Sequence, residues 1–222
     1  MKMYDITNQI PQCNYSQSRD GYKPEAIALH ITGDSAEHQT TNWFREKIAC
    51  VSAHYVIEKN GDTYICVYPQ FKAYHCGIVI APTAQIYFDK GNVNPNKYTI
   101  GIECVSSGEP LTQEQITSLR QLVFDLCNTY RIPLNRYHII GHNELDSVKR
   151  RFDPISSYNA DIVIPKIEEV VNVTVDEALA LQVAAGIINS PEYWKKVVDT
   201  TKNFDQYVIN VGKKLQELQN GK

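Results

Sequence analysis

The chain has 222 residues, of which 43% are hydrophobic and 21% are charged, a composition that excludes a disordered or fibrous protein. The formal net charge is −3 and no long basic run occurs, so we expect no nucleic-acid partner. Membrane insertion is not expected either, because no apolar run approaches the roughly 20 residues that a spanning helix needs.

The N-terminal segment MKMYDITNQIPQCNY contains one lysine and no apolar core, which is unlike a secretory signal. We therefore expect synthesis in the cytoplasm, with release by another factor if the target lies outside the cell. The cysteines form no CxxC pair and are scattered through apolar stretches, so we expect free, mostly buried thiols rather than a structural zinc site. There are six of them: Cys13, Cys50, Cys66, Cys76, Cys104 and Cys127.

Patterns of strands and helices can be followed along the first part of the chain. Residues 26–32 (AIALHIT) are mostly apolar and predict a buried strand, and residues 35–49 have the spacing of a helix. The segments HYVIEK and DTYICVY flank Asn60-Gly61, the strongest short signal for a hairpin. A loop-rich stretch, 77–97, precedes a further strand, 99–105.

A long amphipathic helix is predicted over residues 112–130. Thr112 and Gln115 make a capping box at its start, and Pro133 follows its end. One apolar stripe runs along it: Ile116, Leu119, Leu122, Val123, Leu126, Cys127 and Tyr130. Residues 137–142 (YHIIGH) predict the last strand, which delivers His142 at its end.

The character of the sequence changes after residue 157. We expect a catalytic domain over residues 1–158, a linker over 159–173 and a small helical domain over 174–222. A heptad-like seam in the last helix is formed by Phe204, Val208, Val211, Leu215 and Leu218. A module this small buries little apolar surface, so we expect it to bind the cell wall or to self-associate, for example as a homodimer through its helices.

Three side chains suggest a metal site. His30 lies inside an apolar strand, His142 ends another strand, and Asp153 precedes Pro154. Two histidines and one carboxylate are typical of a catalytic zinc site, because three protein ligands leave a position open for water. Each residue alone also has an ordinary structural reading, as a core histidine or a turn aspartate.

The surrounding residues add to this pattern. In chain order they read LHIT, VSAHYVIEKNGDTYICV, AYHCG, NKYTIGIECV and GHNELDSVKRRFDP. Over about residues 20–157 the chain resembles the type 2 N-acetylmuramoyl-L-alanine amidases, a family that includes phage lysozyme amidases, muropeptide-recycling amidases and peptidoglycan recognition proteins. The resemblance implies an α/β fold, with a central mixed β-sheet flanked by helices.

The resemblance also implies one catalytic Zn²⁺ held by the imidazoles of His30 and His142 and by Asp153, at a position where some relatives have Cys. Asp146 competes for the third place, but the Asp-Pro context favours Asp153. Glu103 is implied as the general base, which fits a carboxylate in an otherwise apolar strand.

Other positions relate to the cleft of the family. Some relatives have a catalytic Tyr where this chain has Ala53, which again favours Glu103 as the base. Arg151 stands where a Lys is common, and we expect it to stabilise an oxyanion, although its geometry differs from that of Lys. His54 and His75 match cleft residues that would contact substrate or orient the metal ligands; they can also be ordinary half-buried histidines.

The implied reaction is cleavage of the amide bond between N-acetylmuramic acid and L-alanine in bacterial peptidoglycan. We favour a lytic enzyme, an endolysin or autolysin, because a C-terminal module suits attachment to a cell wall. A cytosolic amidase that recycles soluble muropeptides uses the same chemistry and is the alternative. A binding protein without activity is a third reading, which the complete set of implied ligands disfavours.

Overall fold

The structure is a computed structural model that describes residues 2–154, 160–164 and 179. The chain divides into two compact units, Met1–Ile164 and Pro165–Lys222. The predicted linker and helical module lie almost entirely outside the described residues, so they stay predictions, as does the division of the chain into domains.

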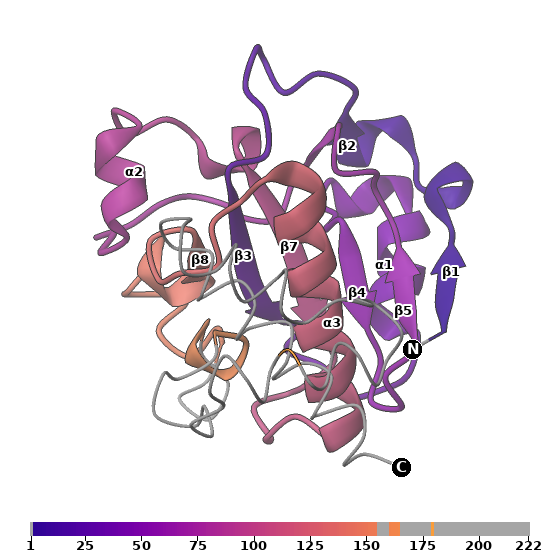
Figure 1. Cartoon of the computed structure of the whole chain (residues 1–222). Coiled ribbons are helices and arrows are strands. Elements are labelled where there is room, and N and C mark those ends of the chain that lie inside the picture. Colours follow the sequence, from indigo (N-terminus) through magenta and orange to yellow (C-terminus); the bar gives the residue numbers. More distant parts are fainter. Residues whose placement is uncertain (1, 155–159, 165–178, 180–222) are drawn as a thin grey trace. The chain divides into compact units, whose positions relative to one another are not determined.

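A mixed six-stranded sheet forms the centre of this unit, in the order β1-β5-β4-β7-β3-β8 (Figure 1). Its strands are β1 (Met3–Asp5), β3 (Ala26–Ile31), β4 (Tyr55–Ile57), β5 (Thr63–Ile65), β7 (Thr99–Cys104) and β8 (Ile139–Gly141). All neighbours are parallel except β4 and β5. A separate antiparallel pair is formed by β2 (Tyr15–Ser16) and β6 (Lys72–Ala73). The α/β fold with a mixed sheet is confirmed.

Three α-helices are described: α1 (Gln39–Arg45), α2 (Gln85–Asp89) and α3 (Gln113–Tyr130). Short 3-10 turns occupy Thr7–Gln9, Gln12–Asn14, Lys47–Ala49, Pro95–Lys97, His142–Glu144 and Ala160–Ile162. The prediction of one helix over residues 35–49 was wrong in extent. His38 has a left-handed backbone, with φ of 62°, and Glu46 is extended, so the α-helix is confined between them.

The hairpin predicted at Asn60-Gly61 is confirmed, because β4 and β5 pair antiparallel on either side of it. Gly61 has φ of +82°, a conformation that favours glycine. A Cβ on this residue would also lie 2.9 Å from the Glu114 carbonyl oxygen and from Ser118 Oγ of α3. Glycine is therefore required here both by the turn and by the close approach of the helix.

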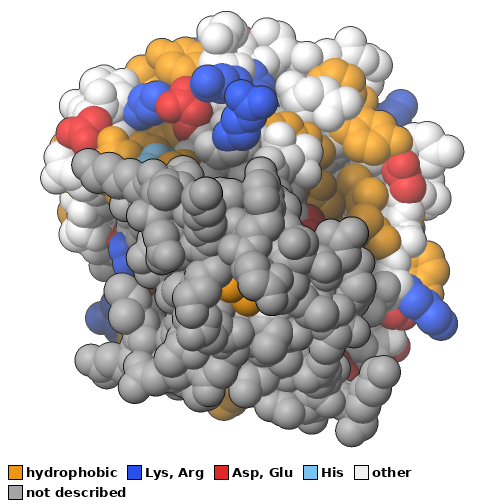
Figure 2. Space-filling model, in the orientation of Figure 1, with side chains coloured by type: hydrophobic (Ala, Val, Ile, Leu, Met, Phe, Trp, Pro, Cys, Tyr) orange, Lys and Arg blue, Asp and Glu red, His pale blue; other side chains and the backbone are white. Residues whose placement is uncertain are grey.

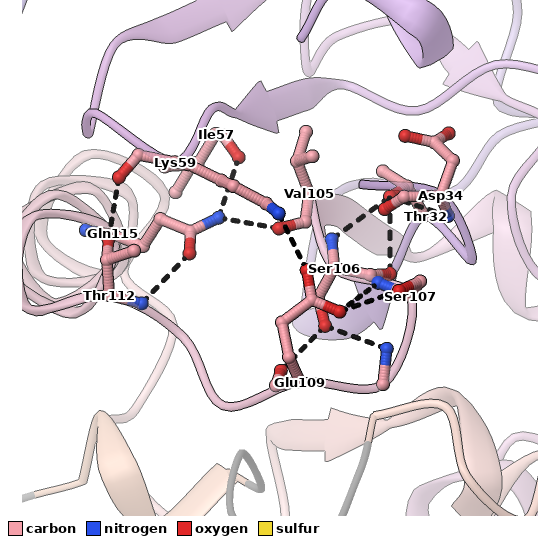
Figure 3. A network of polar contacts seen from close by, with 11 residues as sticks. Thr32, Asp34, Ile57, Lys59, Val105, Ser106, Ser107, Glu109, Thr112 and Gln115 are labelled. Atoms are coloured by element: carbon pink, nitrogen blue, oxygen red, sulfur yellow. Dashed lines mark hydrogen bonds and ion pairs between the residues drawn. The ribbon is translucent and has the colours of Figure 1, made fainter. Parts of the chain in front are cut away.

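The capping box of α3 is confirmed, and it also anchors the helix to the sheet (Figure 3). The Gln115 amide donates to the carbonyl oxygens of Val105, at 2.9 Å, and Ile57, at 3.3 Å. The Thr112 hydroxyl donates to the Lys59 carbonyl at 2.6 Å. The first turn of α3 is thus held by the ends of β4 and β7.

The two faces of the sheet have different partners. The stripe of α3 packs on one face, where Leu119, Leu122, Val123, Leu126 and Cys127 are buried together with alternate residues of the central strands: Ile27, Leu29, Tyr55, Ile57, Ile100, Ile102 and Cys104. On the opposite face, Phe44 of α1 packs with Val56 and Val105. In Figure 1, α3 lies over the sheet next to β7, and α1 lies by β4 and β5. The face opposite α3 therefore receives every second side chain of β3 and β7.

The cysteines, the helices and the surface charges of the described residues relate to expectations from the sequence. All six cysteines are free; Cys13 and Cys50 are exposed and the other four are buried. Among the described residues, no helix has the length and apolarity to cross a membrane. Acidic and basic side chains lie next to one another on the described part of the face in Figure 2.

The burial of Leu119 gives a stability prediction. This side chain is fully buried under α3, whereas Phe124, on the same helix, is 46% exposed. Leu119→Ala should lower the free energy of unfolding by about 3 kcal/mol, because it removes buried methyl groups and leaves a cavity. Phe124→Ala is the matched control and should change it far less. Urea denaturation measures both, and equal losses would contradict this packing.

Candidate metal centre

Strand ends bring the candidate residues together at the carboxyl edge of the parallel sheet, where ligands of α/β proteins commonly bind. His30 is the last but one residue of β3, and it pairs in register with Glu103 of β7. His142 follows directly after β8, the other neighbour of β3. Because strand side chains alternate between faces, His30 and Glu103 share the face opposite α3.

His30, His142 and Asp153 converge on one point. The Nδ1 atoms of the two histidines lie 2.9 Å apart, and His142 Nδ1 lies 2.9 Å from Asp153 Oδ2. His30 Nδ1 is 4.0 Å from the same carboxylate oxygen. Within the part of the chain that the structure describes, these three residues form the one group of this kind whose ligand atoms could share an ion.

Backbone contacts hold Asp153 in place. Its Oδ1 accepts a hydrogen bond from the Ile31 N–H at 2.8 Å, so Oδ2 remains for the histidines. Its carbonyl oxygen accepts from the Asn143 N–H at 2.6 Å, which closes the loop that begins at His142. Gly141 permits this closure, because a Cβ there would lie 2.3 Å from Asn143 Oδ1.

The far nitrogen of each histidine has its own partner. His142 Nε2 lies 3.0 Å from the Cys76 carbonyl oxygen, which can only accept, so this nitrogen carries the proton. His30 Nε2 lies 3.0 Å from Nδ1 of His75. Burial, and next the electrostatic effect of the adjacent His142 ring, hold the pKa of His30 well below its ordinary value, so the His30 ring is neutral. Two imidazole lone pairs and a carboxylate oxygen then face one another, an arrangement that a cation satisfies.

Glu103 supplies a carboxyl group beside this centre. The atom Oε2 is buried and accepts no hydrogen bond from the residues that the structure describes. Burial, and next the negative charge of Asp153, raise the pKa of Glu103 well above its usual range, while the positive charge of Arg150 opposes the rise. A carboxyl group with a raised pKa can both take up and release a proton near neutral pH.

Arg151 lies outside these contacts. Its side chain is exposed, and its guanidinium carbon lies 4.6 Å from the centre of the exposed Phe152 ring. The charge that acts on Glu103 and His30 is that of the neighbouring Arg150. Sequence reasoning missed Arg150, although the run Lys149–Arg151 was a signal that more than one cation lies near Asp153.

Asp146, the alternative third ligand, has a different environment. It is buried, and its Oδ1 accepts hydrogen bonds from the backbone N–H groups of Val148, at 3.1 Å, and Lys149, at 2.8 Å. These bonds shape the loop between His142 and Asp153. Asp146 is not one of the three residues whose ligand atoms converge.

His54 and His75 lie behind the candidate ligands, and neither faces open solvent. His54 is fully buried; its Nδ1 accepts from the Gly101 N–H at 2.9 Å, and its Nε2 is 3.1 Å from the Phe71 carbonyl oxygen. The guanidinium of Arg19 also lies 2.8 Å from that Nε2. His75 is 8% exposed and contacts His30. Contact of either histidine with substrate stays a prediction.

The sequence of this chain is similar to that of a known protein over part of its length. A curated relative, the 1,6-anhydro-N-acetylmuramyl-L-alanine amidase AmpD of Haemophilus influenzae, is 33% identical over 105 residues, which are 47% of this chain and 52% of the relative. The match therefore spans about half of that protein's length.

Two solved structures share the fold at low sequence identity. A crystal structure of AmpD superposes with a TM-score of 0.57 at 19% identity, covering 73% of this chain and 92% of that one. A mutant endolysin from Bacillus subtilis superposes with a TM-score of 0.51 at 19% identity, covering 68% and 89%. The family profile described as N-acetylmuramoyl-L-alanine amidase matches residues 20–156, and this range contains all three converging residues. The chain belongs to the N-acetylmuramoyl-L-alanine amidase family.

Proposed function

We propose that this protein hydrolyses the amide bond between N-acetylmuramic acid and L-alanine in bacterial peptidoglycan, with one zinc ion as cofactor. The observation that carries the proposal is the convergence of His30, His142 and Asp153 beside the Glu103 carboxyl group, in a chain of the amidase family. A peptidoglycan-binding protein without activity would need neither the complete ligand set nor a buried carboxyl group next to it.

The residues fit zinc by their chemistry, since two imidazole nitrogens and one carboxylate oxygen are common ligands and leave one position open. Zinc, when bound, lowers the pKa of a water ligand and polarises the amide carbonyl. The ring partners of His30 and His142 keep the ligand nitrogens directed at this position.

Glu103 acts as the proton carrier of the reaction. In its ionised form it takes a proton from the attacking water, and the protonated carboxyl group then gives this proton to the leaving L-alanine amine. The raised pKa favours the second transfer, because a more weakly acidic group holds the proton until the amine needs it. Arg151 is the proposed donor to the oxyanion, and its exposed guanidinium group is accessible to a bound substrate.

We further propose that the protein is a lytic enzyme that acts on the cell wall after release from the cytoplasm. A lytic role is supported by the fold shared with the Bacillus subtilis endolysin. A second candidate is recycling of soluble muropeptides, which is supported by the curated relative that is named for a 1,6-anhydro substrate. Wall attachment or dimerisation through residues 174–222 remains a prediction from the sequence.

Digestion of purified cell walls tests the reaction itself. Release of new L-alanine amino groups, without new reducing sugar ends, is the expected result. Wall binding without release of amines would contradict the proposal. The ratio of kcat/KM on intact walls to kcat/KM on soluble 1,6-anhydro muropeptides then separates the two roles, since a recycling enzyme should prefer the soluble substrate.

The ligands have a direct test in zinc binding. His30→Ala and Asp153→Ala should each lose zinc, measured by metal analysis after dialysis, and should lose wall hydrolysis with it. His138→Ala is the control, because His138 contacts Asn135 and lies outside the converging group. If Asp153→Ala retained zinc while a matching Asp146 variant lost it, the third ligand would be wrongly assigned.

Glu103→Gln should separate metal binding from turnover. The substitution keeps the size of the side chain but cannot carry the proton, so kcat should fall by about 10²–10⁴. Zinc content should remain that of the wild type. Full activity in this variant would remove Glu103 from the reaction.

Glu103 should also affect stability in the metal-free protein. Its folded-state pKa is raised, so the folded chain binds the proton more tightly than the unfolded chain does. The stability that the protonated Glu103 contributes is fully present below the pKa of about 4.3 that this group has in the unfolded chain. It is lost as the pH rises through the pKa of Glu103 in the folded chain. Wild type should therefore lose stability relative to Glu103→Gln as the pH rises above about 4, measured by urea denaturation. Parallel pH curves would argue against a raised pKa.

A further inference from the structure

We propose that His75 is a positioning residue of the metal centre: it accepts the Nε2 proton of His30 and thereby fixes the tautomer in which His30 presents its Nδ1 lone pair. The inference rests on the proposed zinc site. Of the two roles that the sequence suggested for His75, substrate contact and orientation of a metal ligand, it selects the second and names the atoms involved.

The first contact lies between the two rings. His75 follows β6 in the chain, and its Nδ1 is 3.0 Å from His30 Nε2. The rings are nearly perpendicular, at 89°, with centroids 5.1 Å apart. A neutral imidazole has one proton, so His30 can present a bare Nδ1 only while the proton stays on Nε2. An acceptor at Nε2 holds it there.

The donor in the hydrogen bond between His30 and His75 can be identified from the Pro95 carbonyl oxygen, which is connected to His75 through Thr99. The Thr99 hydroxyl lies 2.7 Å from the Pro95 carbonyl oxygen, which can only accept, so the hydroxyl proton is committed to it. Thr99 Oγ1 can then only accept from His75 Nε2, which lies 3.3 Å away. With its proton on Nε2, His75 has a bare Nδ1, and His30 must be the donor between the two rings.

The neighbouring thiol is consistent with this direction. Cys76 Sγ lies 3.3 Å from His75 Nδ1, and burial raises the pKa of the thiol to about 12, so the sulfur keeps its proton. A thiol is a weak donor, which leaves Nδ1 of His75 an acceptor in both contacts.

The His75 ring is held closely in this position. A Cβ on Gly101 of β7 would lie 2.5 Å from the ring Cγ, so the ring rests directly on the strand backbone. The backbone N–H groups of His75 and Cys76 both donate to Asn96 Oδ1, at 3.1 and 2.9 Å. With 8% exposure, the ring has little surface to offer a substrate. Its position suits a fixed partner for His30.

Two substitutions of different shape test the proposal in the full chain. His75→Asn places an amide oxygen near the former Nδ1 and should keep zinc affinity within a few-fold of wild type. His75→Leu fills similar space without an acceptor and should weaken zinc binding by about 10- to 100-fold. Competition with a chromophoric chelator measures the affinity, and His138→Leu is the matched control. Thr99→Val removes the acceptor for His75 Nε2 and should give a smaller loss of zinc affinity than His75→Leu.

A measurement on the wild type avoids dependence on folding of the variants. Nitrogen-15 NMR of the metal-free protein should show the His30 proton on Nε2. Urea denaturation of each variant identifies any loss that comes from unfolding. A proton on His30 Nδ1, or unchanged zinc affinity in a folded His75→Leu variant, would overturn the role of His75. If His30→Ala itself retained zinc, the zinc site would be wrong, so the two failures are distinguishable.

Discussion

The alternation of side chains along β3 and β7 is the constraint on which the rest of the structure depends. Ile27 and Leu29 face α3, and His30 faces the other way because it is one residue further along. The same alternation in β7 directs Ile102 into the core under α3 and Glu103 toward the candidate metal centre. A shift of one residue in either strand would put a polar group into the apolar layer under α3, so the packing of the helix fixes the chemistry on the opposite face.

The third candidate ligand, Asp153, comes from a loop, and its position is fixed in a different way. Asp153 is far from His30 in the chain, yet one of its carboxylate oxygens is bound to the backbone of β3 through Ile31. The loop before it is shaped by Asp146, whose carboxylate serves backbone N–H groups. Asp153 has little conformational freedom, because the backbone of β3 holds its carboxylate and the loop backbone holds its carbonyl group. This suits a carboxylate that must lie close to two imidazoles.

Much of this arrangement could be predicted from the sequence, because it depends on local patterns. The buried strands, the Asn60-Gly61 hairpin and the capped helix α3 are all confirmed. The predicted helix over residues 35–49 was too long because a tertiary contact intervenes: the Glu58 carboxylate accepts the His38 N–H at 3.0 Å, where the backbone is left-handed. Strand β1 was missed because three exposed residues carry no periodicity.

The candidate ligands were also named from the sequence, but their surroundings were not. The order of the motifs along the chain identifies the residue types of the site. Which nitrogen of each imidazole carries the proton depends instead on the atoms that the fold places next to the ring. The partners of the His30 and His142 rings come from residues 75 and 76, distant from both in the chain. Arg150 was missed for a related reason, since adjacent arginines in a loop point in directions that composition does not reveal.

The contact between His142 and Cys76 has a consequence for how this site tolerates change. The acceptor is a main-chain oxygen, so the identity of residue 76 is irrelevant to it, while the path of the chain from β6 is decisive. Insertion or removal of one residue there would displace both the oxygen and the neighbouring His75 ring. At residue 76 the site therefore depends on the length of this segment rather than on the type of amino acid, a dependence that comparing amino-acid types at that position would overlook.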